Sequence, residues 1–268
     1  MTPRRRFGQH FLAPAWADKV AAAIDPRRDE RFLEIGPGPG ALTSRLAARA
    51  AHVTAIEIDR DLAADLRRHA PSTLAVVEGN FLDFDLPAFA GGGPLRIAGN
   101  LPYNISSPIL FKLLAAARAS RNVIDATVML QIEVADRLAA SAGTKDYGVL
   151  TIFTAVQADV ARLLTLPPGA FRPAPKVHSA VVRLTFKPPL VPAVLEPAFE
   201  RMVKTMFMQR RKTLGNALRP FADAAGVPAV TALAAANIDP VRRPETLTLP
   251  ELLALANVFQ APRLKPKD

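Results

Sequence analysis

The stretch Arg31-Phe32-Leu33-Glu34-Ile35-Gly36-Pro37-Gly38-Pro39-Gly40 decides the fold of this chain. Its first half is mostly apolar and predicts a buried strand, and its second half is a glycine turn. Apolar residues at helical spacing resume at Ala41. A strand, a glycine turn and a helix in this order allow the backbone to approach a nucleotide-like ligand closely. The stretch therefore predicts the first unit of an α/β sheet, with a ligand where this strand ends.

Predicted strands and helices alternate along the chain on both sides of this stretch. Apolar runs predict strands at residues 53–58, 74–77, 95–98 and 126–130, and β-rich segments at residues 149–156 and 177–186. Helical spacing predicts helices at residues 16–24, 41–46, 61–69, 108–118 and 133–140. This alternation predicts an α/β fold with a doubly wound, mainly parallel, Rossmann-like sheet.

The proline-rich segment 187–192 marks the predicted boundary between a domain at residues 1–187 and a second domain at residues 188–268. The second domain is predicted to be small and all-α, with helices at residues 198–208, 213–218, 227–236 and 250–259. Its basic side chains form either a solvated face or a surface that follows a phosphate backbone: Arg201, Lys204, Arg210, Arg211, Lys212, Arg219, Arg242 and Arg243. The net charge of +10 favours a polyanionic partner, since each neutralised phosphate releases counterions.

The composition indicates a globular protein without disulfides or a metal site. With 268 residues, of which 50% are hydrophobic, the chain can bury a full core without covalent cross-links. It has no cysteine, which excludes disulfides and thiolate metal sites and fits a reducing compartment. Its four histidines are scattered without metal-ligand spacing, so we expect no metal.

Neither a signal peptide nor a membrane span is expected. The chain starts with basic residues, but polar residues interrupt the apolar segment that a signal peptide needs: Gln9, His10, Asp18 and Lys19. The most apolar long window, residues 149–166, carries Gln157, Asp159 and Arg162, which argues against a span. We therefore expect a soluble, cytoplasmic protein that acts as a monomer.

The glycine loop leaves two classes of ligand open. Its spacing departs from the dinucleotide fingerprint G-x-G-x-x-G because position 41 is alanine, although alanine can replace the third glycine. Glu57 follows about 20 residues later, where a carboxylate binds ribose hydroxyls, unless it is an ordinary charge at a strand end. Pro37 and Pro39 remove two N–H donors that phosphates would need. The loop thus favours S-adenosylmethionine, which has no phosphate, over a nicotinamide dinucleotide.

A second stretch, Gly99-Asn100-Leu101-Pro102-Tyr103-Asn104, carries the candidate chemistry. Asn100 offers an amide oxygen, and the following proline biases Leu101 towards an extended conformation that leaves its carbonyl outside any helix. Tyr103 presents a flat aromatic face. Two acceptors beside an aromatic plate suit a planar ring that bears an amino group. The same residues also suit an ordinary turn before the helix predicted at residues 108–118.

The candidate ligand contacts fall at the ends of four predicted strands. The carboxyl ends of parallel strands meet at one edge of a sheet, so we expect these residues to lie along one rim: Gly36, Glu57, Asn80 and Asn100. Asn80 follows the third of these strands, where a contact with the adenine edge is expected. Their shared position at one edge of the sheet predicts a ligand site more strongly than any one of these residues does alone.

Several motifs together resemble one family, the rRNA adenine N6,N6-dimethyltransferases of the bacterial small ribosomal subunit. The resemblance covers nearly the whole chain and rests on these segments: Phe7-Gly-Gln-His-Phe-Leu12, Glu34-Ile-Gly-Pro-Gly38, Ile56-Glu-Ile-Asp59, Gly99-Asn-Leu-Pro-Tyr-Asn-Ile-Ser106, Met129-Leu-Gln-Ile-Glu133, Phe171-Arg-Pro-Ala-Pro-Lys-Val177 and Phe207-Met-Gln-Arg-Arg-Lys-Thr213. The related antibiotic-resistance methyltransferases of large-subunit rRNA match the later segments less well.

The resemblance implies that S-adenosylmethionine is bound by His10, Leu12, Gly36, Glu57, Asn80 and Asn100. Here His10 stands where the family often has asparagine, and Asn80 stands where it usually has aspartate, which implies weaker donor binding but the same chemistry. The implied substrate is a pair of adjacent adenosines in the 3′-terminal hairpin of 16S rRNA, within an assembling small subunit.

For catalysis, we expect the Asn100 side-chain oxygen and the Leu101 carbonyl to accept the two hydrogens of the adenosine amino group. Tyr103 is expected to stack on the flipped base, and the resemblance implies that Phe171 closes the other face. RNA phosphates are expected to contact Arg4, Arg5, Arg6, Arg210, Arg211 and Lys212. Two other functions stay open, a ribosome-assembly factor in which catalysis is secondary and a nicotinamide-dependent oxidoreductase.

Overall fold

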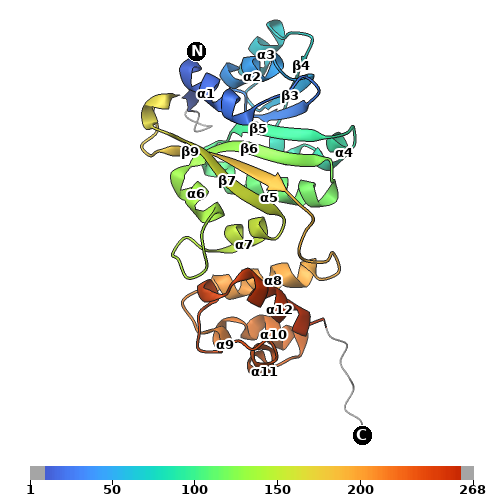
Figure 1. The fold of residues 1–268 in the computed structure, drawn as a ribbon, viewed down its shortest axis with the longest axis vertical. Coiled ribbons are helices and arrows are strands. Elements are labelled where there is room, and N and C mark those ends of the chain that lie inside the picture. Colours follow the sequence, from blue (N-terminus) through green and yellow to red (C-terminus); the bar gives the residue numbers. More distant parts are fainter. Residues whose placement is uncertain (1–9, 261–268) are drawn as a thin grey trace. The chain divides into compact units, whose positions relative to one another are not determined.

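The computed structural model describes residues 10–260 of the chain. This part folds into two compact units (Figure 1). The first unit comprises the residues up to Asp136 together with Gln157–Pro188, and the second comprises Arg137–Val156 and the residues from Pro189 onward. No helix among the described residues is long and apolar enough to cross a membrane.

A seven-stranded sheet with the order β4-β3-β2-β5-β6-β9-β7 forms the first unit. Its strands are β2 (Arg31–Ile35), β3 (His52–Glu57), β4 (Leu74–Glu78), β5 (Leu95–Asn100), β6 (Val123–Gln131), β7 (Ala158–Leu166) and β9 (Ser179–Phe186). The first five in spatial order are parallel, and β9 is antiparallel to β6 and to β7. The fold is therefore the expected doubly wound, mostly parallel, Rossmann-like sheet. Its strand order reverses between β2 and β5, and ligands bind at such a switch point.

Helices and short turns complete the first unit. They are α1 (Pro14–Ile24), α2 (Ala41–Ala47), α3 (Arg60–Arg68), η2 (Phe81–Asp83), α4 (Leu86–Ala90), η3 (Tyr103–Ile105), α5 (Ser106–Ala119), α6 (Ile132–Leu138) and η4 (Pro168–Ala170), with α6 crossing into the second unit. Close to the N-terminus, β1 (Phe11–Leu12) pairs with β8 (Phe171–Arg172) in a separate two-stranded sheet.

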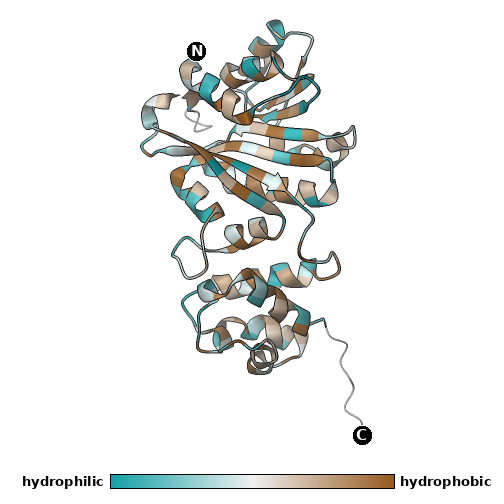
Figure 2. Ribbon diagram, in the orientation of Figure 1, coloured by the Kyte–Doolittle hydropathy of each residue, from teal (hydrophilic) through white to brown (hydrophobic). Residues whose placement is uncertain are grey.

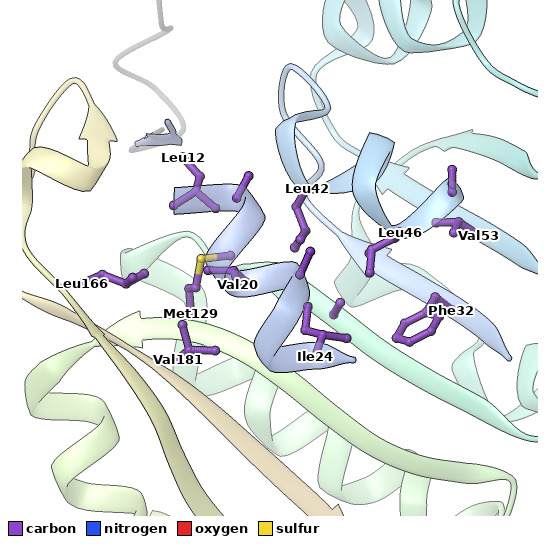
Figure 3. Packing of buried hydrophobic residues seen from close by; sticks show 14 of the residues in the cluster. Leu12, Val20, Ile24, Phe32, Leu42, Leu46, Val53, Met129, Leu166 and Val181 are labelled. Carbon is purple, nitrogen blue, oxygen red and sulfur yellow. The ribbon is translucent and has the colours of Figure 1, made fainter. Parts of the chain in front are cut away.

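One hydrophobic cluster of the first unit lies between the sheet and the helices α1 and α2. Side chains of α1, such as Val20 and Ile24, and of α2, such as Leu46, pack into one buried cluster with Phe32 of β2 (Figure 3). Figure 2 shows hydrophobic residues along the strands of this sheet and along the helices of the second unit. Burial of these strands between helices is what a parallel sheet requires.

Helices form the second unit: α7 (Val149–Ala155), α8 (Glu196–Met208), α9 (Leu214–Ala217), α10 (Arg219–Ala225), α11 (Ala229–Ala235) and α12 (Leu249–Val258), with the short turn η5 (Pro244–Thr246). The sequence predicted a boundary near residue 188 and an all-α second domain, but it left residues 137–156 in the first domain. In the structure these residues belong to the second unit.

The β-rich prediction for residues 149–156 is wrong, because this segment forms α7. Its β-branched and aromatic residues are typical of strands, yet tertiary contacts override that preference. The Gly148 N–H donates to Thr151 Oγ1 (3.1 Å) at the start of the helix, and Phe153 packs against Phe199 with ring centroids 6.3 Å apart. The strand lies just beyond, at β7.

Candidate active site

One pocket opens at the carboxyl ends of β2, β3, β4 and β5, at the switch point of the sheet. The predicted site residues His10, Leu12, Gly36, Glu57, Asn80, Asn100, Leu101 and Tyr103 all line it. Among the described residues, Phe171 is the one predicted pocket residue that does not. The structure therefore brings together predicted residues from five separate segments of the chain.

The glycine loop is fixed in place by Glu57. Gly36, Gly38 and Gly40 have φ angles of 65°, 57° and 87°, a region that glycine adopts without a steric penalty. The Gly38 N–H donates to Glu57 Oε2 (2.9 Å), and the Asp59 N–H donates to Glu57 Oε1 (2.9 Å). Burial raises the pKa of the Glu57 carboxyl, although both backbone hydrogen bonds favour its charged form. Each carboxylate oxygen keeps capacity for a further hydrogen bond, as contact with ribose hydroxyls requires.

Glu34 is a pocket residue that the sequence analysis did not single out. Glu34 lines the pocket and is buried, and its Oε2 has no hydrogen-bond partner in the described part of the chain. Burial raises the pKa of this carboxyl to about 8, and the charge of Glu57 adds to the rise. The signal for it was a charged residue inside the apolar run at residues 31–35. Because buried polar atoms are normally hydrogen-bonded, this oxygen is a candidate acceptor for a hydrogen bond from a ligand.

The charge of the pocket distinguishes the two ligand classes. Glu34 and Glu57 line it, and no lysine or arginine does so within residues 10–260. The Glu57 carboxylate, whose charged form two backbone N–H groups favour, attracts a ligand with positive charge, such as a sulfonium and an ammonium group, and repels a pyrophosphate. The Gly38 N–H, which a phosphate would need, already bonds to Glu57. The residues present therefore fit S-adenosylmethionine better than a dinucleotide. No group of three or more potential ligands that could hold a metal occurs among the described residues.

Hydrogen bonds to backbone carbonyls fix the positions of the acceptor groups of Asn100 and Leu101. Asn100 Nδ2 donates to the backbone carbonyl of His10 (2.7 Å), which orients the amide and leaves Oδ1 as an acceptor. The Leu101 N–H donates to the Met129 carbonyl (3.3 Å) across β5 and β6. No hydrogen bond from a described residue takes the Leu101 carbonyl. Two neighbouring acceptors are thus available at the pocket.

His10 contacts Tyr103 in a way that the sequence did not predict. The two rings are stacked, with centroids 5.2 Å apart and planes 27° apart. His10 Nδ1 lies 2.7 Å from the Pro173 carbonyl, and the Tyr103 hydroxyl lies 2.7 Å from Ser179 Oγ. Burial raises the pKa of Tyr103. The Tyr103 ring is therefore fixed by its contact with the His10 ring and by the hydrogen bond between its hydroxyl and Ser179.

Phe171 lies in the hydrophobic cluster instead of the pocket. Its side chain is completely buried (0% exposed), and its backbone pairs with Leu12 between β8 and β1. This position supports the wall behind the pocket.

Asn80 begins η2 beside the pocket. Its Oδ1 accepts the Leu82 N–H (3.0 Å), and its Nδ2 donates to Asp83 Oδ2 (3.1 Å). Lys112 of α5 reaches the same turn, because its Nζ donates to the Leu82 carbonyl (2.6 Å). The sequence analysis did not include Lys112, since its partner turn is distant in sequence.

The basic residues expected at RNA divide into three groups. Arg4, Arg5 and Arg6 lie outside the described residues. Arg210 is engaged within the second unit, with its Nη2 donating to the Thr144 carbonyl (3.1 Å). Arg211 and Lys212 are exposed.

One protein-family model, described as ribosomal RNA adenine dimethylase, matches residues 1–255. A curated relative from Aromatoleum aromaticum, named ribosomal RNA small subunit methyltransferase A, is 45% identical over 261 residues, which cover 96% of this chain and 94% of the relative. A relative of the same name from Methylibium petroleiphilum is 47% identical over 257 residues, covering 94% of this chain and 95% of the relative.

Two solved structures resemble the chain over nearly its whole length. A dimethyladenosine transferase from Plasmodium falciparum superposes with a TM-score of 0.77 at 26% identity, covering 92% of this chain and 96% of that one. The 23S rRNA methyltransferase ErmE superposes with a TM-score of 0.68 at 28% identity, covering 93% of this chain and 99% of that one.

Proposed function

The chain belongs to the ribosomal RNA adenine dimethylase family, and from that premise we propose how and where it acts. It is an S-adenosylmethionine-dependent methyltransferase that dimethylates rRNA adenines. Its proposed targets are two adjacent adenosines in the 3′-terminal hairpin of 16S rRNA, within the assembling small subunit. The names of the two small-subunit relatives, at 45% and 47% identity, support this choice of subunit.

The observation that carries the proposal is the pocket that joins two carboxyl groups to the acceptors at Asn100 and Leu101. When bound, S-adenosylmethionine supplies an electrophilic methyl group on a positively charged sulfur. Glu57 balances the positive charge of this donor and also binds the ribose hydroxyls. Gly36 allows close backbone contact, Asn80 meets the adenine edge, and His10 and Leu12 cover the donor.

The Asn100 oxygen and the Leu101 carbonyl accept the two hydrogens of the adenosine amino group. This turns the nitrogen lone pair, otherwise delocalised into the ring, towards the methyl carbon. Bound S-adenosylmethionine would supply the methyl carbon to this nitrogen, its sulfur would keep the bonding electron pair, and the extra proton of the nitrogen would pass to water. Alignment of this kind contributes about 7–11 kcal/mol of barrier lowering. No charged base is needed before transfer, because the amine becomes acidic only afterwards.

Tyr103 stacks on the flipped base. Stacking contributes about 1–3 kcal/mol per base, which offsets much of the few kcal/mol needed to extrude it. Phe171 closes the other face in this proposal, which requires its completely buried ring to move out of the hydrophobic cluster.

The proposal includes the setting of the reaction. The chain acts as a monomer in the cytoplasm, where its rRNA substrate is assembled, and it needs no metal. Arg4, Arg5, Arg6, Arg211 and Lys212 hold rRNA phosphates, and Arg210 supports the same surface.

Incorporation of labelled methyl groups into undermethylated small subunits, with the modified nucleoside identified, tests this function. Asn100→Ala should abolish transfer and keep part of the donor binding, because it removes an acceptor and leaves Glu34 and Glu57 in place. Asn257→Ala, at an exposed position of α12, is the matched control and should keep the wild-type rate. Wild-type turnover in Asn100→Ala would reject the mechanism. Absence of dimethyladenosine with the wild-type chain would reject the function.

A further inference from the structure

The side-chain amide of Asn80 makes hydrogen bonds of opposite polarity at the turn η2. Its Oδ1 accepts the Leu82 N–H (3.0 Å), and its Nδ2 donates to Asp83 Oδ2 (3.1 Å). The first bond caps the turn, and the oxygen of an aspartate or a serine would serve equally well there. The second bond is not part of such a cap, because it uses the nitrogen. It therefore needs a reason other than the stability of the turn.

The bond to Asp83 fixes which end of the Asn80 amide is the oxygen. An amide turned end for end would place Nδ2 against the Leu82 N–H and Oδ1 against the Asp83 carboxylate, and both contacts would be repulsive. In the observed orientation, one lone pair on Oδ1 and one hydrogen on Nδ2 make no bond to a described residue. Because Asn80 lines the pocket, this acceptor and this donor are available to a ligand.

Lys112 anchors the same turn to the helix α5. Its Nζ donates to the Leu82 carbonyl (2.6 Å), a short bond of the kind that a charged donor makes. The same Nζ lies 5.4 Å from the centroid of the Phe81 ring, and Phe81 is buried and lines the pocket. One turn earlier in α5, Ile109 lines the pocket as well. The turn that carries Asn80 is thus tied to a helix that forms another part of the pocket wall.

Adenine presents the pattern that this amide complements. Its amino group donates and a neighbouring ring nitrogen accepts, and an asparagine amide can bond to both. We propose that Asp83 is a positioning residue for the methyl donor, which holds the Asn80 amide in the orientation that recognises adenine, on a turn that Lys112 anchors. This inference rests on the proposed function, because it takes S-adenosylmethionine as the ligand. Asp83 acts through Asn80 and not by contact with the ligand.

Calorimetry with a pair of donor analogues tests the orientation of the amide. S-adenosylhomocysteine carries adenine. S-inosylhomocysteine carries hypoxanthine, in which an oxygen replaces the amino group and the neighbouring ring nitrogen carries a hydrogen. The wild-type chain should therefore prefer the adenosyl compound, because the fixed amide opposes the reversed pattern.

Asp83→Ala should weaken binding of the adenosyl compound by about two- to tenfold, the effect of one hydrogen bond, and should reduce the preference over the inosyl compound. In methyl transfer, the same variant should raise KM for the donor and keep kcat, since Asn100 and Leu101 are unchanged. Asp29→Ala, which removes an exposed carboxyl group in the turn before β2, is the matched control and should keep both affinities. Asp83 is itself exposed, so its replacement leaves the core intact.

Lys112→Met separates the anchor from the orienting residue. This variant keeps the apolar stem and removes the ammonium group, so it should weaken binding of both compounds alike, because it loosens the turn without freeing the amide. An unchanged preference in Asp83→Ala, with or without an equal loss of affinity for both compounds, would overturn the role of Asp83. Wild-type affinities in Lys112→Met would overturn the anchor. A wild-type chain that binds neither compound would instead reject the proposed function.

Discussion

His10 contacts two pocket residues, through the Asn100 amide and the Tyr103 ring, and it also bonds to the Pro173 carbonyl. Two roles follow for its side chain, a hydrogen bond to the methyl donor or a ring contact that supports Tyr103. The first needs a polar group, which asparagine keeps. The second needs a flat ring, which phenylalanine keeps.

We expect the ring contact to dominate, because the two rings are stacked with centroids 5.2 Å apart. His10→Phe should then keep KM for the small subunit near the wild-type value. His10→Asn should raise it by about two- to tenfold, since it removes an aromatic interaction of about 0.5–1.5 kcal/mol. Steady-state kinetics with small subunits, together with calorimetry of donor binding, make the comparison. A fall in donor affinity in His10→Phe that His10→Asn does not share would assign the side chain to the donor.

At the scale of elements, the approach of β5 to β2 determines where Asn100 lies. Gly99 pairs beside Ile35, and a Cβ added at Gly99 would lie 2.6 Å from the Ile35 carbonyl oxygen. Gly99→Ala must therefore push β5 away from β2 at the switch point. We expect a loss of about 1–3 kcal/mol in the free energy of unfolding. We also expect about a 100-fold loss of methyl transfer, since a displacement of about 1 Å misplaces the acceptors.

Denaturant unfolding and methyl transfer measure the two effects. Gly169→Ala is the control, because a Cβ at that exposed glycine meets nothing within 4 Å. A wild-type free energy of unfolding in Gly99→Ala would contradict this prediction, because it would show that β5 can move away from β2 without loss of stability.

The elements themselves were largely predictable. The five parallel strands follow from apolar runs, and the rim of Gly36, Glu57, Asn80 and Asn100 follows from where those runs end. The predictions failed where contacts between residues distant in sequence determine the local structure. Residues 149–156 have the composition of a strand but form a helix against α8, and the ring of His10 meets a tyrosine that no local pattern connects to it.

At the scale of the whole molecule, the buried acids make stability depend on pH. Burial raises the pKa of Glu34 from 4.5 to about 8, so the folded chain holds a proton that the unfolded chain releases between these values. Stability should therefore fall as pH rises from about 5 to 8, and then level off. Glu34→Gln keeps the shape and removes the titration. Its stability relative to the wild type should rise over the same interval, as measured by denaturant unfolding at several pH values. A constant difference between the two proteins would exclude Glu34 as the source.

The path of the chain through its two units has a consequence for the order of synthesis. The chain leaves the sheet after β6, contributes residues 137–156 to the second unit, and returns to complete the sheet with β7 and β9. As the polypeptide emerges from the ribosome, α7 with its Phe153 ring is made before its partner Phe199. A protein truncated near residue 188 therefore leaves this apolar insert uncovered, and simple removal of the C-terminal helices does not yield a well-behaved sheet domain.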